Sequence, residues 1–242
     1  MVAATGLVAF NILLMFSLRH AEPGLVGAIV GGSPLVLALV GPLQEGRRPA
    51  ARLVVAAAVV VAGAALVQGG GSGDALGVLG AVGLLFSEAS FSLVAAPLLP
   101  RLGPARVSAW SCALAVPMLL LGISIVGEDP RVPGGGEFLG IAFLGLVLTV
   151  VAFVSWYTGV RGLGVERAGV FVGLVPVASM ATAAVADGAV PGPLELAGVV
   201  LVTAALVAGL SAAGRLDVRE DDLAQRRLRV QVAGAGGHDE RE

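Results

Sequence analysis

The chain has 242 residues, of which 57% are hydrophobic and 36 are glycine, while only 13% are charged. Soluble domains carry about twice that share of charges, so charges are too few to cover a soluble protein of this size, and the apolar excess predicts a protein embedded in a lipid bilayer. The net charge of −2 and the lack of a basic cluster interleaved with aromatic residues argue against a nucleic-acid partner.

The residue types also exclude several chemistries. All 15 basic residues are arginine, which excludes a phosphate-binding loop ending in Gly-Lys-Ser/Thr and a lysine Schiff base. The single cysteine, Cys112, and the two histidines, His20 and His238, predict neither a disulfide nor a metal site. No pair of acids and no Ser-His arrangement lies within the apolar segments, so we predict no enzyme, no cofactor and no bound metal.

Stretches free of charge predict the membrane spans, because about 20 helical residues cross a hydrocarbon core of about 30 Å. We find eight, with the fourth interrupted by one acid: residues 2–18, 24–43, 53–67, 75–99, 107–126, 138–160, 168–186 and 196–213. No basic residue precedes the first stretch and no convincing cleavage site follows it, so we interpret it as a span and not a signal peptide. Residues 214–242 are rich in charges and predict a solvated, partly disordered tail.

Arginines in the loops predict the orientation, because short loops rich in arginine stay in the cytoplasm. With eight alternating spans, only Arg19 and Arg131 fall on one side, and the other thirteen arginines fall on the opposite side. Losing or adding one span would scramble this bias. The sequence therefore predicts a multi-pass protein of the plasma (inner) membrane with both termini in the cytoplasm.

A shift of 142 residues aligns the first three segments with the last three. It superimposes rare residues on one another: Arg19 on Arg161, Gly27 on Gly169, Gly31 on Gly173, Pro34 on Pro176, Glu45 on Asp187, Gly46 on Gly188 and Pro49 on Pro191. Under the predicted orientation the first and sixth segments run in opposite directions, so the copies form an inverted repeat, as in many secondary transporters.

The second copy has two further spans before its matched part, so a complete unit has five helices. We therefore expect a partial first unit of three helices at residues 1–68, a Gly-rich linker at 69–74, a complete second unit at 75–213 and the tail at 214–242. The predicted fold is an all-α polytopic membrane protein with eight transmembrane helices, an inverted repeat whose first two helices are missing.

Short motifs in this order resemble one known family. They are S-L-R-H-A-E-P-G at 17–24, G-G-S-P-L at 31–35, Q-E-G-R-R-P at 44–49, G-D-A-L at 73–76, G-V-R-G-L-G-V-E-R-A-G at 159–169 and L-V-P at 174–176. Together they resemble the EamA-type family of the drug/metabolite transporter superfamily, with ten helices in two inverted halves. The resemblance implies transport of small metabolites or drugs and covers nearly all of residues 1–213. Of the family's ten helices, the first two are expected to have no counterpart in this chain.

Glu88 is the only charged side chain inside a predicted span and lies near the centre of its segment. An ionised group at mid-bilayer costs roughly 3 kcal/mol, so it must be protonated, paired or in a wet cavity. Its helix face carries mostly small residues and predicts an inward orientation. We weigh two roles evenly: binding a proton or a cationic substrate group, or a buried carboxyl bonded to Ser92 or a neighbouring helix.

Pro34 and Pro176 lie at matched positions, where each removes a backbone donor from mid-span. Matched interruptions point to a binding site at the midplane, and an ordinary proline kink is the alternative. The glycine pairs beside them form G-x-x-x-G motifs, which we interpret as helix-packing surfaces, with a homodimer interface as the minority interpretation. These glycines are Gly27, Gly31, Gly169 and Gly173.

Three further residues are candidates for the substrate pathway: Asn11, Trp156 and Tyr157. Asn11 could bond a solute, although a hydrogen bond between helices is favoured for it. The two aromatic rings could stack on an aromatic or cationic solute, and anchoring at the membrane interface is the simpler alternative.

We therefore predict a gradient-driven secondary transporter, an exporter of a small organic solute, that works by alternating access. The rival hypothesis is a truncated, non-transporting membrane protein that acts only as a helical interaction partner or dimer. The partners we expect are the solute and the lipid bilayer.

Overall fold

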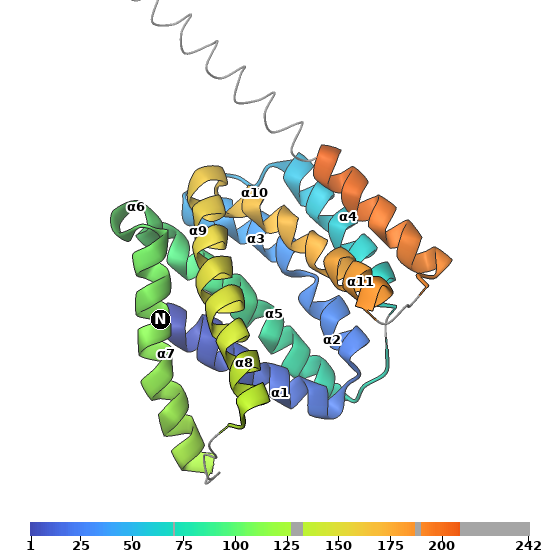
Figure 1. The fold of residues 1–242 in the computed structure, drawn as a ribbon. Coiled ribbons are helices and arrows are strands. Elements are labelled where there is room, and N and C mark those ends of the chain that lie inside the picture. The colour runs from blue at the N-terminus through green and yellow to red at the C-terminus, as the bar shows by residue number, and fades with distance from the viewer. Residues whose placement is uncertain (70, 127–132, 187–189, 209–242) are drawn as a thin grey trace, which may run out of the picture.

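The computed structural model describes residues 1–69, 71–126, 133–186 and 190–208. Their regular structure is helical, and Figure 1 shows a bundle of long helices. Seven helical stretches are long and apolar enough to cross a membrane, and a shorter apolar helix follows at Pro193–Ala208. The chain is thus a multi-pass membrane protein. The last part of the expected eighth span, residues 209–213, lies outside the described residues.

The first half of the chain forms three spans. The first is a π-helical segment, Ala3–Ala9, that continues into α1, Phe10–His20. The second is divided into α2, Pro23–Val30, and α3, Ser33–Gln44, and the third is α4, Ala51–Gln68.

The second half begins with α5, Ala75–Ala95, whose N-cap Asp74 accepts a hydrogen bond from the Gly77 amide at 2.8 Å. The short helices Ala96–Leu98 and α6, Leu99–Leu102, lead into α7, Pro104–Val126. The next span joins α8, Gly135–Phe143, a π-helical segment at Leu144–Val151 and α9, Ala152–Leu163. The span after it joins α10, Val165–Val170, a short 3₁₀ turn at Phe171–Gly173 and α11, Leu174–Ala186.

Most helices begin a few residues before the charge-free stretches predicted from sequence. The spans include charged residues at their ends, such as Arg52 in the first turn of α4 and Glu137 in the first turn of α8. The Glu137 carboxylate accepts a hydrogen bond from the Gly134 amide at 2.9 Å, which satisfies a donor at the helix start. Span boundaries predicted from uncharged stretches alone therefore leave out the charged residues at these helix ends.

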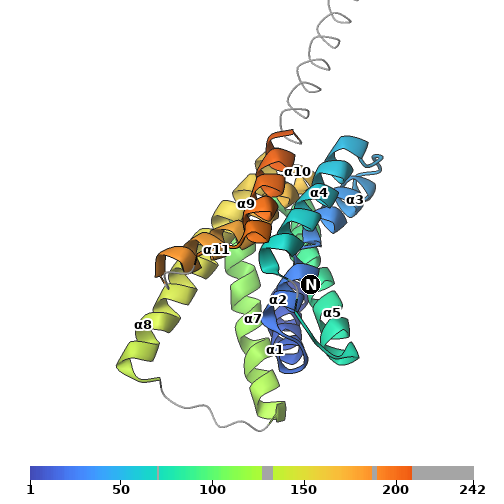
Figure 2. The ribbon, with the colours of Figure 1, turned by 90° about the vertical axis from the view of Figure 1, so that its right-hand side faces the viewer.

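Helix α5 packs against α1, α2, α3 and α9 (Figure 1). One apolar cluster joins α3, α5, α7, α9 and α10 around the fully buried Tyr157, and a second joins α4, α10 and the Pro193–Ala208 helix. By contrast, no residue of α8 or of the adjoining segment Leu144–Val151 is buried, and Figure 2 shows α8 leaning away from α7.

Candidate functional site

A break in the second span places backbone polar groups inside the bundle. Helix α2 ends at Val30, Gly31 and Gly32 form a turn, and α3 begins at Ser33. Pro34, fully buried in the second position of α3, has no amide hydrogen to donate to the Val30 carbonyl. The turn packs directly on α5, because a β-carbon built on Gly32 would lie 3.7 Å from the Leu85 side chain.

Glu88 lies one turn beyond Leu85 on α5 and faces this break. The Ser33 hydroxyl, 0% exposed, lies beside the Glu88 carboxyl group. Even so, Ser33 Oγ and Glu88 Oε2 are buried, and neither makes a hydrogen bond of normal geometry within the described residues. The carboxyl group points inward, as expected from the small residues on its helix face.

Ser92, the residue that sequence reasoning paired with Glu88, has a different partner. Its Oγ accepts a hydrogen bond from Trp156 Nε1 at 2.9 Å. The Glu88 carboxyl instead faces the neighbouring helix α3, so the carboxyl and the indole lie one turn apart along α5.

Tyr157 and Trp156 of α9 lie inside the bundle. Tyr157 is 0% exposed and its hydroxyl donates to the Phe91 carbonyl at 3.2 Å. The Phe91 ring stacks on Tyr157 with ring centroids 4.8 Å apart and lies 4.7 Å from the Phe153 ring. Tyr157 therefore lies in the interior and not at an interface with lipid, and the cluster forms an aromatic wall close to the Ser92 turn of α5.

Asn11 and Pro176 lie apart from the Ser33 and Glu88 pair. The Asn11 side chain is exposed, and its Nδ2 donates to the Leu7 carbonyl of its own helical span at 2.8 Å. Pro176 is buried in the first turn of α11, directly after the second helix break.

The four glycines of the G-x-x-x-G motifs all lie at close helix contacts. A β-carbon on Gly169 would lie 2.8 Å from Leu37, and one on Gly173 would clash with the Val60 side chain. One on Gly31 would lie 3.3 Å from Ala64, and one on Gly27 would meet the Gln68 side chain at 2.7 Å. Each glycine thus faces another helix of the same chain or its end.

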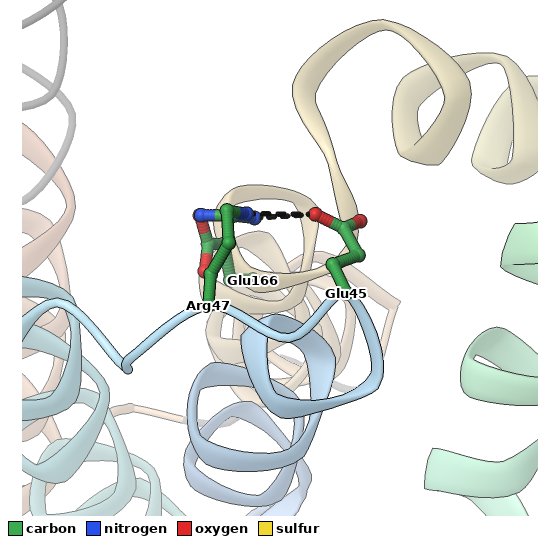
Figure 3. Close-up of polar contacts among 3 residues, drawn as sticks. All are labelled: Glu45, Arg47 and Glu166. Carbon is green, nitrogen blue, oxygen red and sulfur yellow. Dashed lines mark hydrogen bonds and ion pairs between the residues drawn. The ribbon is translucent and has the colours of Figure 1, made fainter.

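A charged cluster joins the end of α3 to the start of α10 (Figure 3). Arg47 Nη2 lies 2.6 Å from Glu45 Oε2, and Arg47 Nη1 lies 3.4 Å from Glu166 Oε1. The hydrogen bond with Glu45, followed by the attraction of Glu166, raises the pKa of Arg47. Glu45 thus pairs with Arg47, whereas Asp187, its counterpart under the shift of 142 residues, lies outside the described residues.

A second polar contact joins the turn between α1 and α2 to the connection before α5. His20 Nδ1 lies 3.1 Å from Asp74 Oδ2, and the Glu22 carboxylate accepts from the Ser72 hydroxyl at 2.8 Å and from its amide at 3.1 Å. The Gly77 amide and then His20 lower the pKa of Asp74, and the bonds from Ser72 lower that of Glu22.

No group of three His, Cys, Asp or Glu side chains that could hold a metal ion occurs in the part of the chain that the structure describes. The interior polar groups are hydroxyls, an indole, a carboxyl and backbone carbonyls. Such groups can bind a polar or positively charged solute, or a proton, by hydrogen bonds and charge.

A family model described as the EamA-like transporter family matches residues 75–209, which is more than half of the chain. The chain belongs to the EamA-like transporter family. This EamA-like chain is also 31% identical over 185 residues to a Bacillus subtilis (strain 168) protein named "Uncharacterized transporter YdeK", with 70% of this chain and 60% of that protein covered. A solved crystal structure of a protein matches the fold with a TM-score of 0.77 at 26% identity, covering 89% of this chain and 76% of the other.

Family membership confirms the resemblance seen in the sequence motifs. The EamA-like chain spans 60% of the length of its curated relative.

Sequence reasoning missed Ser33 and Glu166. Ser33 lies within the G-G-S-P-L motif next to Pro34, and Glu166 lies within the G-V-R-G-L-G-V-E-R-A-G motif between two arginines. A hydroxyl next to a helix-breaking Gly-Gly pair and an acid at the first turn of a helix were the available indications.

Proposed function

We propose that the chain is a secondary transporter of small organic solutes in the plasma membrane, driven by a gradient and working by alternating access, with export as the favoured direction. Membership of a transporter family supports the class. The observation that carries the mechanism is a pair of helix breaks at matched positions, because such interruptions supply polar backbone at the depth where solutes bind.

The two breaks are related by the shift of 142 residues. Adding 142 to the first residue of α2, Pro23, gives residue 165, where α10 begins. The same shift carries the turn at Gly31 and Gly32 onto the end of the Phe171–Gly173 turn. The Ala3–Ala9 segment falls on residues 145–151, inside the second π-helical segment, Leu144–Val151. This correspondence supports an inverted repeat in which residues 1–68 form a partial unit and residues 75–213 a complete one.

The placement of the units receives further support from the family match, which begins at residue 75. Under this arrangement the ends of α3 and α9 lie on the cytoplasmic side, together with the cluster of Arg47 and Glu166. The contact of His20 with Asp74 lies on the opposite side. Both termini are proposed to be cytoplasmic.

In this proposal, Glu88, Ser33 and the aromatic wall around Tyr157 and Trp156 line the substrate pathway. Glu88 is the group that takes up a proton or a positively charged group of the solute. The remaining candidates, Asn11, Pro34 and Pro176, act through the helix breaks and the helix surfaces next to them.

The test begins with cells that express the chain and are challenged with a panel of toxic amino-acid, nucleoside and organic-cation analogues. Any compound to which expression gives resistance is then followed, in radiolabelled form, in everted membrane vesicles with and without an ionophore. We expect accumulation that the ionophore abolishes and that Glu88→Gln lowers at least tenfold. Glu22→Gln, the same change at the membrane surface, serves as the control. An unchanged rate and pH dependence in Glu88→Gln would reject the coupling role.

One observation favours a second candidate, a non-transporting interaction partner or dimer. Helix α8 and the segment after it bury no residue and present only apolar or small side chains along most of their length. This candidate predicts specific disulfide cross-links between copies that carry Gly140→Cys in a Cys112→Ala background, together with no solute phenotype in the screen.

A further inference from the structure

Oxygen atoms without partners gather at the break between α2 and α3. Ser33 Oγ and Glu88 Oε2 lie beside each other and are both buried from water, and neither makes a hydrogen bond of normal geometry within the described residues. Ser33 is 0% exposed, so its hydroxyl has no access to solvent from the outside. Buried polar atoms are normally satisfied, and two of them side by side indicate a missing partner.

The break also frees a backbone oxygen one helical turn before Ser33 in the sequence. Pro34 leaves the Val30 carbonyl without its helical donor, and Val30 ends α2. The carbonyl end of a helix carries a partial negative charge, whereas the start of α3 at Ser33 carries a partial positive charge that favours an ionised Glu88. The start of α3 therefore favours an ionised Glu88 carboxylate, and the end of α2 favours a bound cation that neutralises it.

No cation of the chain neutralises Glu88 in the described structure. The helices packed on α5 carry Arg19 and His20 at the end of α1, and Tyr157 and Arg161 on α9. His20 pairs with Asp74, and the Tyr157 hydroxyl donates to the Phe91 carbonyl. The described ion pairs join other residues and leave Glu88 out.

We propose that Ser33, Glu88 and the Val30 carbonyl form a binding site for a monovalent cation held by oxygen atoms, whether an alkali-metal ion or the ammonium group of a solute. One carboxylate balances one positive charge, whereas calcium sites gather more carboxylates and zinc prefers nitrogen and sulfur ligands. The inference deepens the proposed function, on which it rests, by naming the ligand that the carboxylate takes.

The test measures thermal unfolding of the full chain in detergent while one cation replaces another at constant ionic strength. N-methyl-D-glucamine chloride, whose cation is too bulky for such a site, is the reference. Sodium chloride forms one arm and methylammonium chloride the other. A ligand at 100 times its Kd is expected to raise the midpoint of unfolding by about 5 to 10 °C, with saturation.

Two variants and a control assign the effect to the site. Glu88→Gln and Ser33→Ala are expected to remove the rise, and Ser33→Ala carries the test alone where Glu88→Gln fails to fold. Ser17→Ala is the matched control, because Ser17 is equally buried against α5 but its hydroxyl already donates to the Leu13 carbonyl at 2.6 Å. It should keep the full rise.

A rise with sodium alone identifies a metal ion as the ligand, a rise with methylammonium alone identifies an ammonium group, and a rise with both shows that the site accepts the shared chemistry. The proposal is overturned by a wild-type midpoint that stays flat in both arms or changes only with pH, and equally by a rise that persists in both site variants. Solute transport without any cation effect overturns this inference alone, and a cation effect without transport overturns the proposed function alone.

Discussion

A glycine contact between α4 and the Pro193–Ala208 helix should set how closely the last described helix docks. A β-carbon built on Gly63 would lie 2.8 Å from the Gly198 carbonyl oxygen, and one built on Gly198 would lie 2.6 Å from the Gly63 carbonyl oxygen. Ordinary contacts begin at 3.4 Å, so the helices must separate by 0.6 Å (3.4 − 2.8) for alanine at residue 63 and by 0.8 Å (3.4 − 2.6) at residue 198. The nearest atom on each side is a backbone oxygen, which cannot move aside as the end of a flexible side chain could, and the Val202 and Val67 side chains and amides lie almost as close.

Gly63→Ala is therefore expected to lower the free energy of unfolding by about 1–3 kcal/mol, the usual range for overpacking. Because one separation relieves both clashes, the Gly63→Ala/Gly198→Ala double variant should lose clearly less than the sum of the two single losses. Thermal unfolding of the purified chain in detergent measures all three. Gly140→Ala is the control, since a β-carbon on Gly140 has nothing within 4 Å.

Two results would refute this reasoning. One is a Gly63→Ala midpoint equal to that of Gly140→Ala. The other is a double variant whose loss equals the sum of the single losses, because independent sites would then replace a shared contact.

Three further predictions follow from single contacts. Ser92→Ala removes the acceptor of the Trp156 Nε1 hydrogen bond and should lower the free energy of unfolding by about 1–3 kcal/mol. Thr158→Ala, on the exposed side of α9, which also carries Trp156, should change it little, and equal losses in the two variants would contradict the role of the indole bond. Arg47→Ala should lower the unfolding midpoint more than Glu45→Ala, because it leaves the nearly buried Glu166 carboxylate without its cation, and the reverse order would refute this. The pKa of Asp74 is lowered on folding, so the stabilisation from its carboxylate is present above about pH 4 and is lost as the pH falls below that value. Asp74→Asn should therefore show a smaller acid-induced fall in the unfolding midpoint than the wild type. A fall equal to that of the wild type would count against this role of Asp74.

The spans could be predicted from sequence because in a bilayer the absence of charge is itself the structural requirement. Their ends could not, because residues such as Arg52 and Glu137 are included in helix ends where they meet polar surroundings or free amides. The position of the first break was indicated by Pro34, since the missing amide hydrogen follows from the residue type alone.

The partners of individual side chains depended on tertiary packing. Glu88 and Ser92 share one face of α5, yet one meets Ser33 of α3 and the other meets Trp156 of α9. Sequence spacing places two residues on a face but does not state which neighbouring helix covers each of them. For the same reason Tyr157, near a predicted span end, could not be recognised as a buried residue.

The most direct test of the account asks whether the two broken spans cross the membrane in opposite directions. Gln44→Cys, at the end of α3, and Val190→Cys, after α11, each in a Cys112→Ala background, are exposed sites for an impermeant maleimide in intact and permeabilised cells. An inverted repeat with cytoplasmic termini predicts that Val190→Cys is labelled in intact cells and that Gln44→Cys is labelled only after permeabilisation. Labelling of both residues from the same side would contradict the inverted repeat and, with it, the proposed transport mechanism.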